Sequence, residues 1–259
     1  MQLSYEIPTK YLSQLGQHLD FNFCLAHLAL KDSAYISYYK NSPKFKICDN
    51  SAFELGKPMP AAEVVKAAKF LNANEVICPD SLRNGRETIE TTTEFINYLK
   101  MNGEMGKFQL MGVVQGCNAL DWYECFDFMV KSPDINTVGI NYLSCGIFGS
   151  DPMASRISAV QSALIIHRVT KPIHLLGMGG NPLELKFYKP GTIRSCDTSM
   201  PVVQGLNRNR FDEVSGLVGP KLPRPDNFFE LALDKQQIED IIYNVGLLRK
   251  WATEGLVNV

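Results

Sequence analysis

Short apolar runs rich in β-branched residues alternate along the chain with longer segments of helical period. This alternation is typical of βαβ units, in which helices cover a parallel sheet. We interpret seven runs as strands: Phe23–Leu30, Phe45–Cys48, Glu75–Cys78, Phe108–Val114, Thr137–Ile140, Ile173–Leu176 and Thr192–Cys196. The helical segments are Pro60–Asn72, Glu87–Lys100, Ala119–Val130, Pro152–Val169, Pro182–Tyr188 and a C-terminal helix over Lys235–Trp251.

An α/β barrel of the (β/α)8 TIM type, with the C-terminal helix added, fits this pattern best. Such a barrel needs an eighth strand, which we expect from Ala34–Tyr39 or from a run near Val202. The 259 residues, 45% of them hydrophobic, suit one large domain better than two. We therefore expect a single barrel domain over residues 1–259.

Polar residues follow several of the predicted strands at the point where each strand ends. Asp49, Asp80 and Asp197 are three carboxylates in such positions, Gln115 is an amide, and Gly177–Gly180 is a glycine-rich turn. In TIM barrels the carboxyl ends of the strands carry the active site. A single Asp after a strand is more often a turn former or a helix cap. The joint occurrence of four such residues at one rim favours an active site.

The overall charge gives no general attraction to nucleic acid, because the formal net charge is −1. Three local basic runs remain, namely Arg83–Arg86, Asn207–Arg210 and Lys221–Arg224. Each is a candidate for phosphate contacts, although such runs are usually solvated loops.

The seven cysteines are scattered singly, which indicates buried reduced thiols and no disulfide framework. The N-terminal residues lack the pattern of a signal peptide, and no stretch approaches the roughly 18 apolar residues of a membrane span. We expect a cytoplasmic protein without a membrane partner.

Five segments at the strand ends resemble, in order and approximate spacing, motifs of the tRNA-guanine transglycosylase family. They are CDNSAFELG (Cys48–Gly56), ICPDS (Ile77–Ser81), GVVQG (Gly112–Gly116), HLLGMGGNPLEL (His174–Leu185) and RSCDTSMP (Arg194–Pro201). The first is similar to the D-S-G-G-F-Q loop, and the second occupies the slot of the base-reading aspartate. The third and fourth are similar to G-I-[VQ]-Q-G and Y-L-M-G-V-G-x-P-x-x-L. The last, followed by GLNRNR, resembles the F-D-C-V-x-P-T-R-x-x-R-N-G block.

The sequence departs from the family in two places. The family's zinc site, three cysteines and a histidine after the nucleophile, has no counterpart, because no cysteine follows Cys196 and no histidine follows His174. In the family's G-G-L slot only Gly139 is retained. The resemblance therefore implies a barrel with no zinc subdomain and no cofactor. Such short members are most similar to the phage and bacterial enzymes that insert 7-deazaguanines into DNA, and a phage protein would act in the host cytoplasm.

The resemblance implies a catalytic role for two aspartates. Asp197 matches the nucleophile that attacks the sugar C1′ and forms a covalent aspartyl-glycosyl intermediate. Asp49 occupies the position of the residue that protonates the departing guanine and deprotonates the incoming base.

The other matching positions are expected to bind the base. Asp80 is placed to accept N1–H and the 2-amino group of guanine, while Gln115 and the backbone N–H of Gly139 are candidate donors to O6. Phe53 on one face and Met178 on the other would replace the stacking lost on base flipping, unless they only fill the core.

Four positions carry less definite expectations or none. Leu176 is an alternative to Met178, and Gly177 would either approach the base closely or only turn the strand into its helix. His18 and His27 are assigned no function.

The expected reaction is replacement of guanine in DNA by a 7-deazaguanine such as 7-cyano-7-deazaguanine. The partners are DNA, whose phosphates Arg208 and Arg210 would contact, and the free 7-deazaguanine base. Two alternatives stay open. The polymer is tRNA, or the barrel is a silent subunit that binds nucleic acid or a partner enzyme. The presence of Asp49, Asp80, Gln115 and Asp197 together argues against a silent subunit, because a binding subunit does not need a paired nucleophile and acid.

Overall fold

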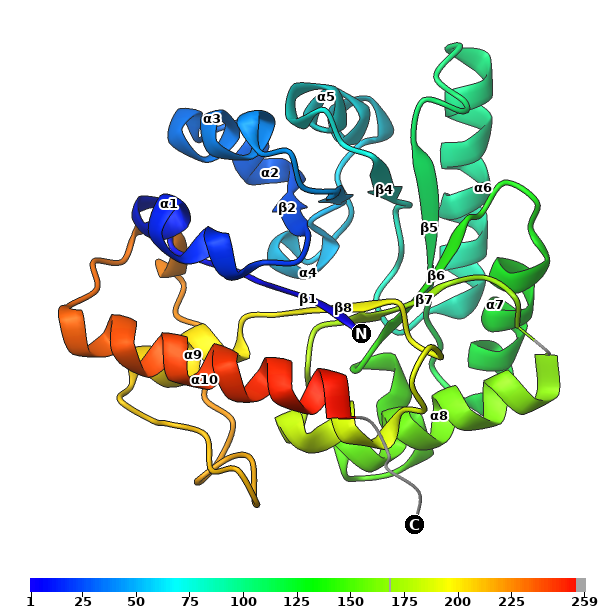
Figure 1. Cartoon of the computed structure of the whole chain (residues 1–259). Coiled ribbons are helices and arrows are strands. Elements are labelled where there is room, and N and C mark those ends of the chain that lie inside the picture. The colour runs from blue at the N-terminus through cyan, green and yellow to red at the C-terminus, as the bar shows by residue number, and fades with distance from the viewer. Residues whose placement is uncertain (168, 255–259) are drawn as a thin grey trace.

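Eight parallel strands form one sheet that curves into a nearly closed barrel in the computed structural model, which describes residues 1–167 and 169–254 (Figure 1). The strands are β1 (Gln2–Tyr5), β2 (Asn22–Leu25), β3 (Lys46–Asp49), β4 (Glu75–Ile77), β5 (Gln109–Val114), β6 (Thr137–Asn141), β7 (Ile173–Leu176) and β8 (Ser195–Thr198). Their order in the sheet is β1-β8-β7-β6-β5-β4-β3-β2. The predicted (β/α)8 barrel is confirmed.

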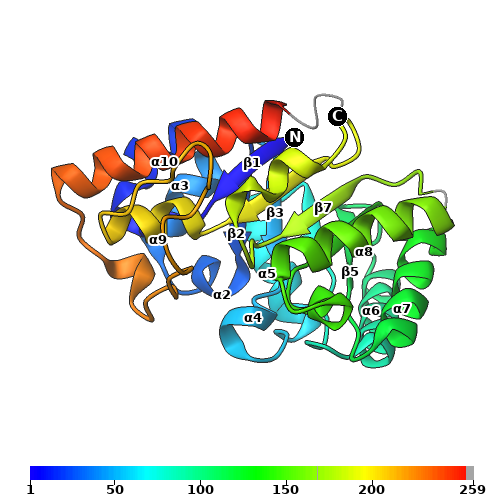
Figure 2. The ribbon, with the colours of Figure 1, turned by 90° about the horizontal axis from the view of Figure 1, so that it is seen from below.

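Helices cover the outside of the barrel (Figure 2). The α-helices are α1 (Leu12–Leu15), α2 (Ala26–Ala29), α3 (Ser33–Asn41), α4 (Ala52–Leu55), α5 (Ala61–Leu71), α6 (Gly85–Met101), α7 (Ala119–Lys131), α8 (Pro152–His167), α9 (Met200–Leu206) and α10 (Lys235–Glu254). Shorter 3-10 turns span Thr9–Tyr11, Gly16–His18, Ser144–Phe148, Pro182–Phe187 and Phe228–Glu230. Side-chain caps fix several starts: Asn84 accepts from Glu87 N–H at 3.1 Å and Asn118 from Asp121 N–H at 3.0 Å. The expected C-terminal helix is α10.

The eighth strand is β1, so both of its predicted locations are wrong. Ala34–Tyr39 lies in α3 and Val202 lies in α9. The missed strand, with the sequence QLSY, has too few apolar residues to stand out, yet three of its four residues are buried. It is hydrogen-bonded to β8, and beside β2 the Ser4 hydroxyl accepts from Phe23 N–H at 3.3 Å.

Several other predicted elements differ in extent or type, and the strand predicted over Thr192–Cys196 is found at Ser195–Thr198. The run Phe23–Leu30 is a strand only to Leu25, after which Ala26–Ala29 is helical. Pro182–Tyr188 forms a 3-10 helix in place of an α-helix. The helix predicted over Pro152–Val169 ends at His167, and residue 168 lies outside the described residues.

One apolar cluster fills part of the barrel interior. Its main side chains are Phe21, Phe23, Leu25, Ile47, Ile77, Met111 and Val113. A larger apolar core fills the space between the sheet and the helices. As expected, the cysteines are mostly buried thiols, and only Cys117 is exposed. None of the helices in the described part of the chain combines the length and hydropathy needed to span a bilayer.

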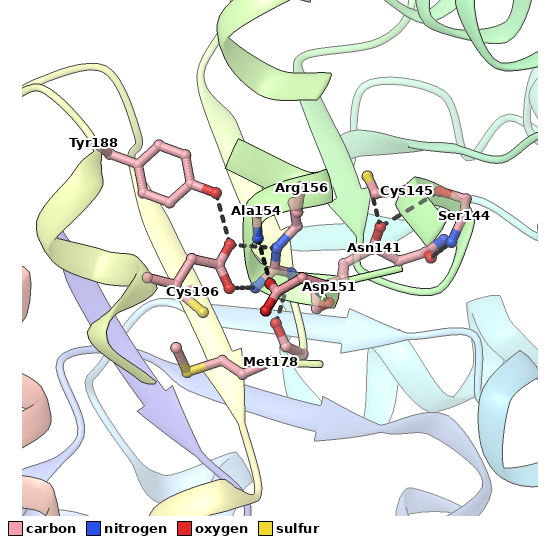
Figure 3. A network of polar contacts seen from close by, with 12 residues as sticks. Asn141, Ser144, Cys145, Asp151, Ala154, Arg156, Met178, Tyr188 and Cys196 are labelled. Carbon is pink, nitrogen blue, oxygen red and sulfur yellow. Dashed lines mark hydrogen bonds and ion pairs between the residues drawn. The ribbon is translucent and has the colours of Figure 1, made fainter. Parts of the chain in front are cut away.

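A buried ion pair holds the carboxyl end of β7 against α8 (Figure 3). The Arg156 guanidinium donates to both Glu184 oxygens, at 2.6 and 2.8 Å, and neither side chain is exposed beyond 1%. Tyr188 donates to the same carboxylate at 2.6 Å. The remaining guanidinium nitrogen donates to the carbonyls of Leu176 and Gly177 at 3.1 and 2.7 Å. The Arg156 guanidinium therefore holds the backbone that follows β7 in place.

We predict that Glu184→Gln lowers the free energy of unfolding by about 3–5 kcal/mol, because Arg156 remains buried without a counterion. The double replacement Arg156→Met with Glu184→Leu should recover most of this loss, since it removes both charges. Denaturant unfolding measures the free energy of unfolding of the single and the double variant. Lys100→Met is the control, because the Lys100–Asp134 pair is partly exposed and is worth at most about 1 kcal/mol. A loss in Glu184→Gln no larger than in the control would contradict the prediction.

Candidate active site

A cavity of about 730 Å³ opens at the carboxyl ends of the strands. Seven of the side chains and glycines predicted for the site line it: Asp49, Phe53, Asp80, Gln115, Gly177, Met178 and Asp197. They come from the ends of β3, β4, β5, β7 and β8 and from α4. The structure thus brings together the three carboxylates and the amide that the sequence analysis selected.

Asp80 is held by two amide side chains at the floor of the cavity. Its Oδ1 accepts from Asn50 at 2.8 Å and its Oδ2 from Gln115 at 2.6 Å. The Gln115 amide is itself oriented, because its oxygen accepts from Arg83 N–H at 2.9 Å. Burial raises the pKa of Asp80, while these hydrogen bonds favour its ionised form. The carboxylate therefore has one fixed orientation, with lone pairs left for a ligand.

Asp49 ends β3 and faces the same cavity. Its Oδ2 accepts from Ser51 N–H at 2.7 Å, and Ser51 has a left-handed conformation with φ of 61°. Burial is the main cause that raises the pKa of Asp49 well above its usual value, and the charges of Glu54, Asp80 and Asp197 raise it further. Asp49 is accordingly a carboxyl group that keeps its proton at a pH where ordinary carboxyl groups are ionised.

Asp197 is fixed through one oxygen. Its Oδ1 lies 3.0 Å from His174 Nε2 and accepts from Gly177 N–H at 3.2 Å. His174 Nδ1 lies 2.8 Å from the Ser195 hydroxyl, which accepts from Arg194 at 3.1 Å. No contact in the described residues occupies Oδ2 of Asp197. This arrangement leaves one carboxylate oxygen of Asp197 available in the cavity.

The glycines after β7 are required by the backbone and by a neighbouring ring. Gly177 has φ of +63°, and a Cβ at Gly179 would lie 2.1 Å from the Tyr142 ring. Tyr142 itself lines the cavity. The first of these glycines places the N–H that binds Asp197, and the second allows Tyr142 to pack against the turn.

A strap formed by residues 221–226, from the C-terminal part of the chain, lines the cavity. Lys221 donates to the Met178 carbonyl at 2.5 Å and lies over the Tyr142 ring. Arg224 forms ion pairs with Glu6 and Glu54. Burial lowers the pKa of Lys221 to about 8 and raises that of Glu6 to about 7. Of the three basic runs in the sequence, this one therefore supplies cations to the cavity.

The two residues predicted to stack on a base differ in exposure. Phe53 is 55% exposed at the cavity wall, so it is not a core residue. Met178 is 2% exposed, and Leu176 also lines the cavity. Only Phe53 is free to change its side-chain orientation without disturbing the core.

Three predicted residues are not part of this cavity. Gly139 lies within β6, where its Cβ position faces Leu176 and Met111 in the interior of the barrel. Arg208 pairs with Asp234, and Arg210 pairs with Asp240 at 2.7 Å and lies over the Tyr243 ring. Among the described residues no group of three His, Cys, Asp or Glu side chains is arranged to hold a metal.

Several side chains of the candidate site escaped the sequence analysis. His174 lies inside an apolar run. Its only signal in the sequence is that a polar residue interrupts an otherwise apolar strand. Glu6 and Arg224 are far apart in sequence, and no spacing connects them. Asn50 follows Asp49 directly and was visible as a departure from the family motif, but its contact with Asp80 depends on the fold.

No model of a known protein family matches the chain, and no curated protein is significantly similar to it in sequence. The barrel and the geometry of the cavity are therefore the observations from which a function is inferred.

We predict that Asp49→Asn raises the unfolding temperature at pH 8 but not near pH 4. In the unfolded chain this carboxyl ionises near pH 4, whereas in the folded protein its pKa is raised. As pH rises, the unfolded state releases the proton first, so wild-type stability falls relative to the variant. Thermal unfolding at several pH values measures the difference.

Asp127→Asn is the matched control of opposite sign. A hydrogen bond from Lys131 lowers the pKa of Asp127, so this variant should lose stability at pH 8 and match the wild type in acid. If Asp49→Asn follows the wild type at every pH, Asp49 ionises as an ordinary carboxyl group.

Proposed function

We propose that the protein is a guanine transglycosylase that replaces guanine in DNA with a 7-deazaguanine such as 7-cyano-7-deazaguanine. The observation that carries the proposal is the pairing of two unlike carboxyl groups in one cavity. Asp49 has a raised pKa, and Asp197 is oriented by two hydrogen bonds with one oxygen left available. An acid and a nucleophile in one pocket are what base exchange needs.

The reaction proceeds in two displacements at the sugar C1′. Asp197 Oδ2 forms a bond to C1′ while the bond from C1′ to the guanine nitrogen breaks, and Asp49 gives its proton to the departing base. The incoming 7-deazaguanine then forms its bond to C1′ and transfers its N–H proton to Asp49. The C1′–Oδ2 bond breaks in this second step. Two inversions restore the original anomer.

Asp80 and Gln115 are the proposed readers of the base. The Asp80 oxygens, each already accepting one amide hydrogen bond, retain lone pairs for N1–H and the 2-amino group. Gln115 uses one Nε2 hydrogen for Asp80 and has a second for O6. Adenine presents neither the N1–H nor the 2-amino group, so this pair favours guanine and 7-deazaguanines alike.

A base within a duplex reaches such a cavity only if it is flipped out of its stack. Phe53 is the proposed stacking partner on one face, because its exposed ring can turn toward an incoming base. Met178 or Leu176 supplies the opposite face. The energy of flipping, a few kcal/mol, makes unpaired guanines the easier targets.

The path of the DNA backbone is proposed along a second pocket of about 380 Å³ that shares His27 and Leu55 with the cavity. Its lining includes Lys31, Lys57 and Lys66, and none of these lysines forms an ion pair with a carboxylate in the described part of the chain. Unpaired lysines beside the site suit contacts with phosphates. That Arg208 and Arg210 contact phosphates stays a prediction.

We predict that the wild-type protein incorporates labelled guanine or 7-cyano-7-deazaguanine into DNA and that Asp197→Asn abolishes this incorporation. Asn has the shape of Asp but cannot act as the nucleophile. Asp49→Asn should slow the exchange by about 10²- to 10⁴-fold, the range typical of lost acid–base catalysis. Single-stranded DNA, duplex DNA and tRNA are offered in parallel.

Each outcome of this experiment decides one part of the proposal. Label that enters only tRNA means that the polymer is RNA and leaves the two aspartates in their roles. Exchange by a folded Asp197→Asn protein removes the nucleophile. Binding of DNA or tRNA without exchange by the wild type favours a silent binding subunit.

We predict that the double replacement Lys57→Gln with Lys66→Gln weakens DNA binding and flattens its salt dependence. The slope of log K against log salt should fall by about 0.7–0.9 for each lysine that contacts a phosphate. Lys100→Gln is the matched control, because Lys100 is paired with Asp134, and Arg208→Gln tests the other predicted phosphate contact. A flatter slope in the Arg208 variant alone would place the DNA on the α9–α10 face.

A further inference from the structure

A column of hydrogen bonds runs through the barrel interior and ends at Asp197. At the amino ends of the strands, Arg194 forms an ion pair with the fully buried Glu75 at 2.7 Å. Its Nε donates to the Ser195 hydroxyl at 3.1 Å, and this oxygen lies 2.8 Å from His174 Nδ1. His174 Nε2 lies 3.0 Å from Asp197 Oδ1. The column links the base of the barrel to the wall of the cavity.

The donors in this column determine which imidazole nitrogen carries the proton. The Ser195 oxygen accepts from Arg194, and its own hydrogen has His174 Nδ1 as its only acceptor partner in the described residues. Nδ1 must then be the unprotonated nitrogen, and Nε2–H faces Asp197. Each member of the column is satisfied in this arrangement and in no other.

The connectivity of a Ser-His-Asp triad links Ser195, His174 and Asp197. Their placement excludes Ser195 as the nucleophile, which is the role of the serine in such a triad. Ser195 is 1% exposed and does not line the cavity, whereas Asp197 does. The serine lies beneath the imidazole, out of reach of a substrate. Ser195 therefore orients His174, and His174 orients Asp197. Asp197 is the member that reacts.

The surroundings hold the imidazole in one orientation. The Phe23 ring stacks on His174 with an interplanar angle of 9°, and the Phe21 ring meets it edge-on. His174 has no exposed surface. It contacts neither solvent nor a molecule in the cavity and can act on a reaction only through Asp197.

We propose that His174 is the positioning residue of the nucleophile. Its Nε2–H, together with Gly177 N–H, binds Oδ1 of Asp197 and directs Oδ2 toward the sugar. This inference rests on the proposed function and adds a part to it. When C1′–Oδ2 forms, Oδ1 becomes the carbonyl oxygen of the glycosyl ester. When that bond breaks, the carboxylate charge returns and the His174 hydrogen bond stabilises it.

The kinetic test compares His174→Leu with His174→Gln. Leucine has no donor, so kcat should fall by about 10- to 100-fold, the value of one hydrogen bond to a charged group. KM and DNA affinity should not change, because the residue does not touch the substrate. Loss of stabilisation for the departing carboxylate should also increase the fraction of protein trapped as the covalent glycosyl adduct, measured by mass spectrometry.

His174→Gln supplies the rescue, because the glutamine amide nitrogen can occupy the place of imidazole Nε2. Its kcat should exceed that of His174→Leu by at least about fivefold, within the range of one charged hydrogen bond. Equal rates in the two variants, or a loss in both accompanied by weaker DNA binding and a lower unfolding temperature, would show that His174 only fills the core. A kcat for His174→Leu within about twofold of the wild type also overturns the inference.

Nitrogen-15 NMR of the imidazole side chains tests the same hydrogen bond without any activity. We expect His174 to carry its proton on Nε2 and to lose the protection of that proton from exchange in Asp197→Ala. A proton on Nδ1 would overturn the inference. If the wild type exchanges no guanine, the proposed function fails, while the NMR result still decides whether His174 positions Asp197.

Discussion

Asp49, Asp80 and Asp197 share one cavity, and the burial of carboxyl groups there is the constraint on which the rest of the site depends. Each carboxyl group has a different set of hydrogen-bond donors. Asp80 is kept between two amides, Asp197 between an imidazole and a backbone N–H, and Asp49 has a single donor and a raised pKa. The three carboxyl groups therefore differ in their hydrogen-bond donors, and burial raises the pKa of Asp49 and of Asp80. The barrel makes this possible because each strand end brings its own neighbours.

The barrel and the rim residues could be predicted from the sequence because both are local properties. A strand such as Ile173–Leu176 is visible as a run of apolar residues, and the residues that follow it must lie at the rim. The missed strand β1 shows the limit of this reasoning. Its residues are buried by β8 and α10, which lie at the other end of the chain. No local sequence pattern predicts this burial.

The partners of the aspartates could not be predicted, since they are set by register and by long-range contacts. His174 meets Asp197 because β7 and β8 pair in a register that places His174 beside Ser195. Arg224 reaches Glu6 across most of the chain. Arg208 and Arg210 looked like free cations in the sequence, but carboxylates at and near α10 neutralise them. Charge in a sequence does not reveal which charges remain available.

The pairing of β1 with β8 also has a consequence for how the chain folds. Gln2 lies beside Ser195 in the sheet, and Glu6 forms an ion pair with Arg224. These contacts have a very large separation in sequence, so loop closure opposes them until the intervening strands are in place. We therefore expect β1 to join the sheet late in folding. The strand that carries Asp197, β8, therefore gains its second neighbouring strand only when this pairing forms.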